Sequence, residues 1–280
     1  MAIITISRGT YSYGRALAGC VAERLGYECL SREVILDAAA GYGIPAEKLT
    51  SAMEKPPTLW QQLTGERIDY LHYVRAALCE RAKDGNLVYH GHAGHLLLAG
   101  VSHVIRVRVT ADMEHRVQAA MRDQGLGRKE AIEYIRRVDR ERVLWTRFLY
   151  KVDWHDATLY DIVLNLGRMS VSNACEILVR MTELDDFKPT PQSMQVVDDL
   201  AVSSRVWAAL SKDVRTTAAD LKVTAAEGVV TITGTTRSWA VVEAIPEVAL
   251  AVHGVKDVRC EVGIGSVYDP VRKPAGTRLW

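Results

Sequence analysis

The sequence lacks a long hydrophobic run, an excess of charge of one sign, and any paired-cysteine motif. No apolar stretch approaches the roughly 18–20 residues that span a bilayer, so no transmembrane segment is predicted. Lysine and arginine number 35 and aspartate and glutamate 34, and the two signs nearly balance within residues 1–183 and within residues 198–280 separately. A protein that coats nucleic acid needs a basic excess, so no nucleic-acid partner is expected.

The cysteine pattern indicates a reducing environment. The five cysteines are scattered and form no CxxC pair, which favours neither a disulfide framework nor a structural zinc site. The first residues, 1–8, hold a short apolar stretch with no basic region before it, so they are predicted as a strand rather than a signal peptide. A cytoplasmic location is therefore predicted.

A length of 280 residues, with 48% hydrophobic and 25% charged residues, is typical of a globular protein of two domains. Residues 184–197 contain two prolines with polar neighbours and show no helical or strand period, so they are predicted as a linker. They separate a first unit, 1–183, from a second, 198–267. Residues 268–280 are expected to form a frayed tail.

Short β-rich runs alternate with helical patterns in the first unit. Strands are predicted at residues 2–6, 27–30, 87–89, 104–109 and 161–164. Between them, for example, Leu71, Val74 and Leu78 recur at helical spacing. Alternation of this kind predicts an α/β fold with a five-stranded parallel sheet that carries helices on both faces.

The second unit follows a different pattern, which predicts a small α+β domain of order αββαβ. Its elements are expected as a helix around residues 202–210, strands at 221–223 and 229–233, a helix at 238–252 and a strand at 257–264. Glu227-Gly228 is a hairpin signal between the first two strands. Pro246 is expected to kink or restart the second helix.

The loop after the first predicted strand carries the most informative motif. It reads Gly9, Thr10, Tyr11, Ser12, Tyr13, Gly14, Arg15, Ala16. Its glycine spacing is that of G-x-x-x-x-G-K-[ST], in which backbone N–H groups and a helix N-terminus hold an anion. Arg15 stands in place of the lysine, and Ala16 lacks the hydroxyl that would ligate Mg²⁺. An ordinary strand-to-helix turn is the alternative reading.

Four separate segments of the first unit resemble the cytidylate-kinase-like family of P-loop phosphotransferases. They are residues 3–9 with Arg15, residues 25–33, residues 88–95 and residues 159–165. The resemblance covers about residues 1–183. It implies a nucleoside monophosphate kinase fold, ATP as the donor together with Mg²⁺, a nucleotide acceptor and a mobile lid rich in arginine. No Mg²⁺ ligand is identified in the sequence.

The resemblance also implies roles for particular residues. The donor would be held by the loop from Gly9 to Ala16. The catalytic candidates are Arg15, Arg137 and Arg140, and the substrate-binding candidates are Arg32, His92, Arg136 and Arg142. The lid segment 122–147 holds eight basic and five acidic residues. A solvated helix with Glu133 and Asp139 as ion-pair partners, and a surface arginine at position 32, remain the alternatives.

His90 and His92 share one face of the third predicted strand, with His95 nearby. Because no acidic or cysteine ligand lies near them in the sequence, no metal site is predicted there. The histidines are expected to line the nucleotide cleft or to act as hydrogen-bonded structural residues.

Residues 198–265 resemble the BON domain, through 199–200, 228–235 and 253–258. That family is associated with phospholipid or envelope binding, but the charge balance of this unit provides no polybasic patch. A lipid, a small molecule and a protein therefore all remain possible partners. Trp207 and Trp239 belong either to a binding face or to the core.

Three functional hypotheses follow. The first is a nucleotide-binding phosphotransferase that moves the γ-phosphate of ATP to a nucleoside monophosphate such as CMP. The second is a catalytically degenerate protein that senses a nucleotide and signals through the BON-like unit. The third, a lipid-associated adaptor, depends on the BON resemblance alone. The missing lysine and hydroxyl favour the second hypothesis, whereas the arginine-rich lid favours the first.

Overall fold

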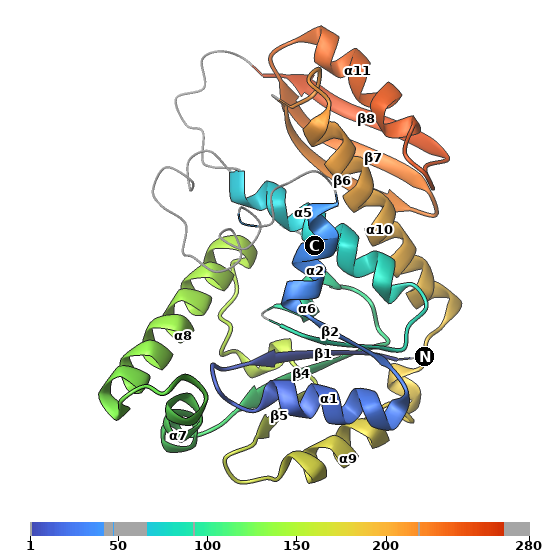
Figure 1. The fold of residues 1–280 in the computed structure, drawn as a ribbon. Coiled ribbons are helices and arrows are strands. Elements are labelled where there is room, and N and C mark those ends of the chain that lie inside the picture. The colour runs from blue at the N-terminus through green and yellow to red at the C-terminus, as the bar shows by residue number, and fades with distance from the viewer. Residues whose placement is uncertain (1, 42–46, 48–65, 92, 218, 266–280) are drawn as a thin grey trace.

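The chain forms a parallel five-stranded sheet followed by a smaller mixed sheet (Figure 1). The computed structural model describes residues 2–41, 47, 66–91, 93–217 and 219–265, without the side chains of 37, 38 and 66–70. The larger sheet has the order β2-β3-β1-β4-β5, and all its pairings are parallel. Its strands are β1 (Ile3–Arg8), β2 (Glu28–Ser31), β3 (Leu87–His90), β4 (Val104–Thr110) and β5 (Ile162–Asn165). The predicted fold class is confirmed.

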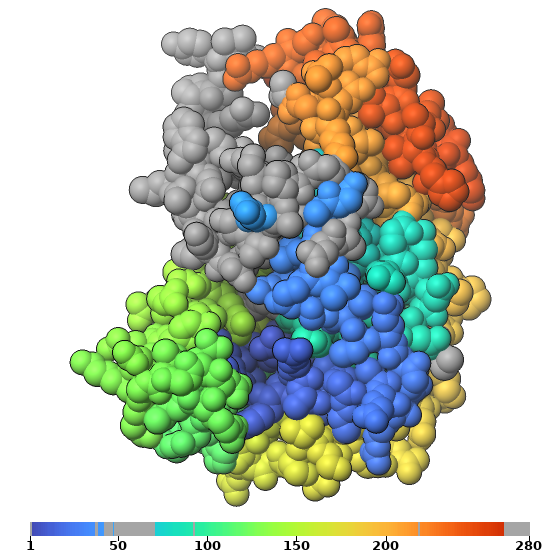
Figure 2. Space-filling view, in the orientation of Figure 1, coloured from blue at the N-terminus to red at the C-terminus, as the bar shows by residue number. Residues whose placement is uncertain are grey.

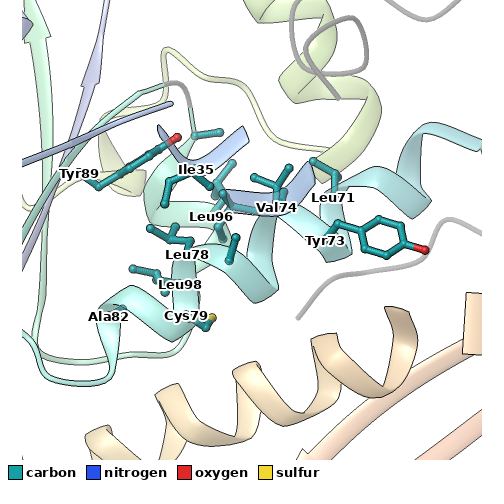
Figure 3. Close-up of a cluster of buried hydrophobic side chains, with 14 of the residues drawn as sticks. Ile35, Leu71, Tyr73, Val74, Leu78, Cys79, Ala82, Tyr89, Leu96 and Leu98 are labelled. Atoms are coloured by element: carbon teal, nitrogen blue, oxygen red, sulfur yellow. The ribbon is translucent and has the colours of Figure 1, made fainter. Parts of the chain in front are cut away.

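Helices cover both faces of this sheet, as the buried strands require. On one face, α1 (Gly14–Leu25) and α9 (Val171–Met181) pack on the sheet, and their buried side chains form a core with those of β1 and β4. The other face carries α2 (Arg32–Ala40), α5 (Glu66–Ala82) and α6 (Gly94–Leu97). Figure 3 shows Tyr89 of β3 together with Leu96, Leu98 and the α5 side chains of this second core.

An arm of two helices projects beside the carboxyl ends of the strands. It consists of α7 (Met113–Gln124) and α8 (Arg128–Tyr150), which share a small apolar cluster around Val117 and Ile135. The last turns of α8 bury Trp145 and Tyr150 in the core around α5. Two short 3₁₀ turns, Ala157–Leu159 and Asp185–Phe187, lie before β5 and after α9.

The smaller sheet has the order β6-β7-β8, with β6 and β7 antiparallel and β7 and β8 parallel. Its strands are β6 (Asp220–Ala226), β7 (Val229–Thr236) and β8 (Asp257–Ile264), and α11 (Trp239–Leu250) packs on them. Glu227 and Gly228 both have positive φ, at 54° and 85°, as a tight hairpin turn requires. The predicted hairpin is confirmed, and α11 continues through Pro246 as one element, without a restart.

Helix α10 (Pro191–Lys212) begins inside the segment that the sequence predicts as an irregular linker. Thr190 caps it, because its hydroxyl accepts a hydrogen bond from the Ser193 amide (3.1 Å) while Ser193 Oγ accepts one from the Thr190 amide (2.9 Å). Pro191 occupies the first helical position, where its missing N–H costs nothing. The expectation that residues 191–197 have no helical structure is therefore wrong.

Helix α10 supplies side chains to two cores. Val197, Ala201 and Trp207 join the core around α5, and the Trp207 ring stacks on His72 with 4.2 Å between ring centroids. The same helix contributes Val202 and Val206 to the core of the smaller sheet. The two sheets are therefore connected by one helix that each of them needs for its own packing.

Polar contacts also join the two units. Arg205 of α10 forms an ion pair with Glu80 of α5, and its second terminal nitrogen donates to the His253 carbonyl oxygen at 3.2 Å. Within the residues that the structure describes, no helix combines the length and the apolar composition that crossing a membrane demands.

We expect Trp207→Ala to lower the free energy of unfolding by about 3–5 kcal/mol, because it removes a large side chain that is only 8% exposed. Trp239→Ala is the matched control, since that ring is 68% exposed and its loss should change the free energy by no more than about 0.5 kcal/mol. Urea unfolding followed by circular dichroism measures both. Equal losses for the two variants would contradict the shared-helix packing.

Candidate functional site

The loop between β1 and α1 leaves the first turn of α1 without a side-chain cap. Tyr11 and Tyr13 have φ of 58° and 63°, a left-handed conformation that is uncommon for residues other than glycine. Tyr13 is the N-cap residue, and its side chain makes no capping hydrogen bond. Ser12 turns back, and its amide and hydroxyl donate to the Gly9 carbonyl oxygen at 3.3 and 2.9 Å. The uncapped amides at the start of α1 are therefore suited to an anion.

The two glycines of the loop have different reasons to be glycine. A Cβ atom on Gly14 would lie 2.6 Å from Cδ and 2.8 Å from Cβ of Arg8, so the Arg8 side chain occupies the space beside Gly14. A Cβ atom on Gly9 would lie 3.5 Å from the guanidinium carbon of Arg116, which is ordinary contact. Close packing therefore requires glycine at position 14, whereas the surroundings of Gly9 leave room for a methyl group.

Four arginine side chains form a cationic cluster at the carboxyl end of β1. They are Arg8, Arg15, Arg32 and Arg142, which come from β1, α1, α2 and α8. Burial lowers the pKa of Arg8, and the charges of Arg32 and Arg15 lower it further, whereas Glu33 opposes them. Burial and then Arg8 lower the pKa of Arg142 to about 10. Arg8 and Arg142 are therefore like charges in a largely desolvated place, whereas the Arg15 side chain is exposed.

The carboxylates near this cluster are few and already engaged. Glu33 pairs with Arg32 at 3.2 Å, and Asp139 lies 3.9 Å from Arg142. The Arg8 Nε atom is buried and has no hydrogen-bond partner among the described residues. Because an unpaired buried donor costs free energy, a ligand with several negatively charged oxygens would be stabilised here.

The α7–α8 arm is clamped to the loop through Thr10, Arg116 and Asp139, which we call the arm clamp. Asp139 Oδ1 accepts hydrogen bonds from the amide (3.1 Å) and the hydroxyl (2.9 Å) of Thr10. Arg116 Nε donates to the Thr10 carbonyl oxygen at 2.7 Å, and the same guanidinium pairs with Asp139. Arg142 donates to the Arg8 carbonyl oxygen at 3.0 Å. In Figure 2 the darkest blue residues lie directly beside the green arm.

Two side chains at the end of β3, Tyr89 and His90, are buried. Tyr89 is fully buried, and a Cβ atom on Gly91 or Gly94 would collide with its ring. Burial raises the pKa of the Tyr89 hydroxyl, which has no hydrogen-bond partner among the described residues. Burial, followed by the charge of Arg8, lowers the pKa of His90 to about 4. Both groups are therefore neutral hydrogen-bonding groups near pH 7.

The structure brings together some of the predicted site residues and separates others. The loop from Gly9 to Ala16 joins β1 to α1, the charges of Arg15 and Arg32 act on Arg8, and Arg142 donates to the Arg8 carbonyl oxygen. Arg136, Arg137 and Arg140 are exposed on α8. Arg137 pairs with Glu141 at 3.5 Å and lies over the Tyr134 ring. His92 lies outside the described residues. The roles assigned to these residues stay predictions.

Sequence reasoning missed Arg8, Arg116 and the position of Asp139. Arg8 is the last residue of a buried strand, and strand carboxyl ends are where ligands bind in open α/β sheets, so its position was an available signal. Arg116 and Asp139 are 106 and 129 residues from Thr10 in the chain. No local pattern in the sequence connects them to the loop.

The donor atoms present fit a polyphosphate better than a metal ion. The uncapped amides and the guanidinium groups match phosphate oxygens. Ala16 offers no side-chain oxygen, and the hydroxyls of Ser12 and Thr10 donate to Gly9 and Asp139. Among the described residues, no group of three or more His, Cys, Asp or Glu side chains could hold a metal ion. The predicted Mg²⁺ is therefore not supported by the ligands that the structure describes.

Sequence comparison separates the same two units. A model of the cytidylate kinase-like family matches residues 3–168, and a model of the BON domain matches residues 198–265. A protein named cytidylate kinase from Ignicoccus hospitalis is 29% identical over 184 residues, which cover 65% of this chain and 99% of that protein.

Among solved structures, an uncharacterized protein from Eubacterium ventriosum superposes with a TM-score of 0.53 at 18% identity, covering 65% of this chain and 99% of that one. This likeness shows a shared fold alone. A shikimate kinase from Bacteroides thetaiotaomicron reaches a TM-score of 0.41 at 11% identity, again over 65% and 99% of the two chains. A score at that level carries no functional argument.

We expect Gly14→Ala to destabilise the protein by about 1–3 kcal/mol, because the new methyl group must displace the Arg8 side chain. Gly9→Ala is the matched control and should change the midpoint of unfolding little, since its methyl group meets only ordinary contacts. Thermal unfolding by calorimetry measures both variants. A larger loss for Gly9→Ala than for Gly14→Ala would show that the packing at the loop differs from that described.

The lowered pKa of His90 should make stability depend on pH. A histidine in the unfolded chain takes up a proton below about pH 6.5, whereas His90 in the folded state stays neutral down to about pH 4. Stability should therefore fall as pH drops through this window. His90→Gln should make that fall smaller, whereas exposed His253→Gln should keep it. Urea titrations at several pH values between 4 and 7 provide the measurement, and parallel curves for His90→Gln and wild type would contradict it.

Proposed function

The chain belongs to the cytidylate kinase-like family and ends in a BON domain, and from that premise we propose that it is a nucleotide-binding phosphotransferase. The reaction would move the γ-phosphate of ATP to a nucleoside monophosphate or a related nucleotide acceptor. The BON domain would bind a ligand, a lipid or a partner. The distant relation to a protein named cytidylate kinase makes CMP the first acceptor to test.

The cationic cluster is the observation that carries this proposal. Where β1 ends and α1 begins, the charges of Arg15 and Arg32 act on Arg8 and Arg142 donates to the Arg8 carbonyl oxygen, beside amides that no side chain caps. Phosphate oxygens accept hydrogen bonds from both kinds of donor, and each additional phosphate brings further negative charge. A nucleotide polyphosphate is therefore the ligand whose charge and shape this site fits best.

The division of roles follows from the elements that carry the arginines. Arg8 and Arg15, beside the loop, would hold the phosphates of the donor, and Arg32 at the start of α2 would hold the phosphate of the acceptor. Arg142 reaches the loop from the arm and would stabilise the charge on the phosphoryl group in transfer. Phosphoryl transfer depends mainly on positioning and charge stabilisation, which guanidinium groups supply.

The exposed arginines of α8 would take part only after a movement. Arg137 and Arg140 lie on solvent-exposed positions of the arm, so a catalytic role for them requires α8 to rotate or close. Such a rotation would have to break the arm clamp, because Asp139 is bonded to the Thr10 amide. We therefore assign the first contact with the transferring group to Arg142.

The second candidate function is nucleotide sensing without transfer. Two observations favour it: Ala16 provides no metal-binding hydroxyl, and Asp139 occupies the Thr10 amide that a phosphate would use. A signal could reach the BON domain because α10 packs on α5 and also belongs to the smaller sheet's core. A cavity of about 360 Å³ lies between α5, α10 and β6, so a ligand bound there would contact both units.

Incubation of the protein with ATP, Mg²⁺ and each nucleoside monophosphate should release ADP above the background that ATP alone gives. Arg142→Gln should lower the rate at least tenfold, because it removes a buried guanidinium from the phosphoryl group. Arg180→Gln is the matched control, since Arg180 is exposed on α9 and, among the described residues, pairs with Glu176 and Glu183. Coupled detection of ADP measures all three proteins.

The outcomes separate the two candidates. ADP formation that depends on a monophosphate and on Arg142 supports the phosphotransferase. Calorimetric binding of ATP without any ADP would leave the sensor as the function. If neither binding nor turnover is found, the nucleotide assignment itself is wrong.

A further inference from the structure

We propose that this site binds its nucleotide polyphosphate free of divalent cation, with the guanidinium groups of the cationic cluster in the place that Mg²⁺ takes in other phosphate loops. The inference depends on the nucleotide binding that both candidate functions share. It goes further, because it fixes the chemical form of the ligand. It also predicts the sign of the response to Mg²⁺.

The side-chain oxygen atoms of the loop are not placed to ligate Mg²⁺. The position where a phosphate loop provides a hydroxyl for Mg²⁺ is occupied by Ala16. Ser12 Oγ donates at 2.9 Å to the Gly9 carbonyl and lies 3.3 Å from the Val109 carbonyl, so it is turned into the protein. Position 16 thus gives the cation no side-chain ligand, and the fully buried Ser12 hydroxyl is not presented to a cation in the loop.

The nearest carboxylate of the arm is committed as well. Asp139 accepts both Thr10 hydrogen bonds and pairs with Arg116. Coordination of a metal by Asp139 would therefore break the arm clamp and leave Arg116 without its counter-charge. Mg²⁺ usually keeps several waters and is held through one or two carboxylates together with the phosphates of the substrate. Around the loop, the described carboxylates Asp139 and Glu33 are both already engaged.

The surroundings of the loop already carry an excess of positive charge. Arg8, Arg15, Arg32 and Arg142 face Glu33 and Asp139, and Arg116 adds a further guanidinium beside the clamp. The positive groups outnumber the negative ones. A divalent cation placed among them would be repelled, whereas the free polyphosphate would meet them with its full negative charge. The Arg8 Nε donor, which is buried and has no partner in the part of the chain that the structure describes, would gain an acceptor.

Mg²⁺ should therefore weaken binding rather than strengthen it. In solution it neutralises half of the charge of a nucleoside triphosphate. In a site that offers the metal no ligands of its own, this loss of charge is not compensated. Binding of the metal-free form should be tighter by about three- to tenfold, and the preference should fall as salt screens the charges.

The test is isothermal titration calorimetry of the full chain with ATP, in EDTA and in excess MgCl₂ at matched ionic strength. Inorganic tripolyphosphate is titrated in the same two buffers. Binding of ATP at least about threefold tighter in EDTA than in MgCl₂ supports the inference. Equal binding in the two buffers, or tighter binding in MgCl₂, overturns it. If tripolyphosphate binds in EDTA but ATP does not, the nucleotide function fails while metal-free polyphosphate binding holds. If nothing binds in either buffer, both are wrong.

A variant that restores the missing hydroxyl provides a second test, because it should reverse the effect of Mg²⁺ on binding. Ala16→Ser puts a hydroxyl at the metal position on an exposed site of the first turn of α1, so Mg²⁺ should now raise the affinity for ATP relative to EDTA. Gly19→Ser is the matched control, because it adds a hydroxyl to the same helix in open space and should keep the wild-type response. If Mg²⁺ strengthens ATP binding equally in wild type and both variants, the inference is overturned.

Discussion

An excess of guanidinium charge around the carboxyl end of β1 is the constraint on which the rest of the site depends. Because Arg8 passes beside the start of α1, position 14 has room only for glycine. The like charges are held in place by bonds from elsewhere, since Arg142 donates to the Arg8 carbonyl and Asp139 fixes Thr10 and Arg116. The loop, the arm and the first helix therefore hold like charges near one another. The repulsion between these charges costs free energy, which an anionic ligand would reduce.

The sequence was sufficient for the sheet and for the loop, because both depend on local patterns. Alternating apolar runs marked the five strands to within two residues, and the spacing of Gly9 and Gly14 marked the turn. Local patterns failed where the contacts are distant. Nothing near Thr10 indicates that Asp139 and Arg116 bond to it, and the helical spacing of α8 alone could not tell that Arg142, rather than Arg137, reaches the loop.

The residues before the second unit fit two opposite predictions, an irregular linker and the start of a helix. Two prolines among polar residues are typical of a linker, but Thr190 followed by Pro191 and Ser193 is also a helix start. The packing decides between them. Val197 and Ala201 are buried in the core around α5, so the free energy of burial favours the helix over an irregular connection. Composition alone does not contain that information.

The double membership of α10 means that this chain has no place where it can be divided cleanly. A cut before the helix would strip Val197 and Ala201 from the larger unit and leave the face of α5 exposed to water, and a cut after it would take Val202 and Val206 from the smaller one. Either unit expressed alone would therefore need a substitute for the helix surface that it loses at the junction.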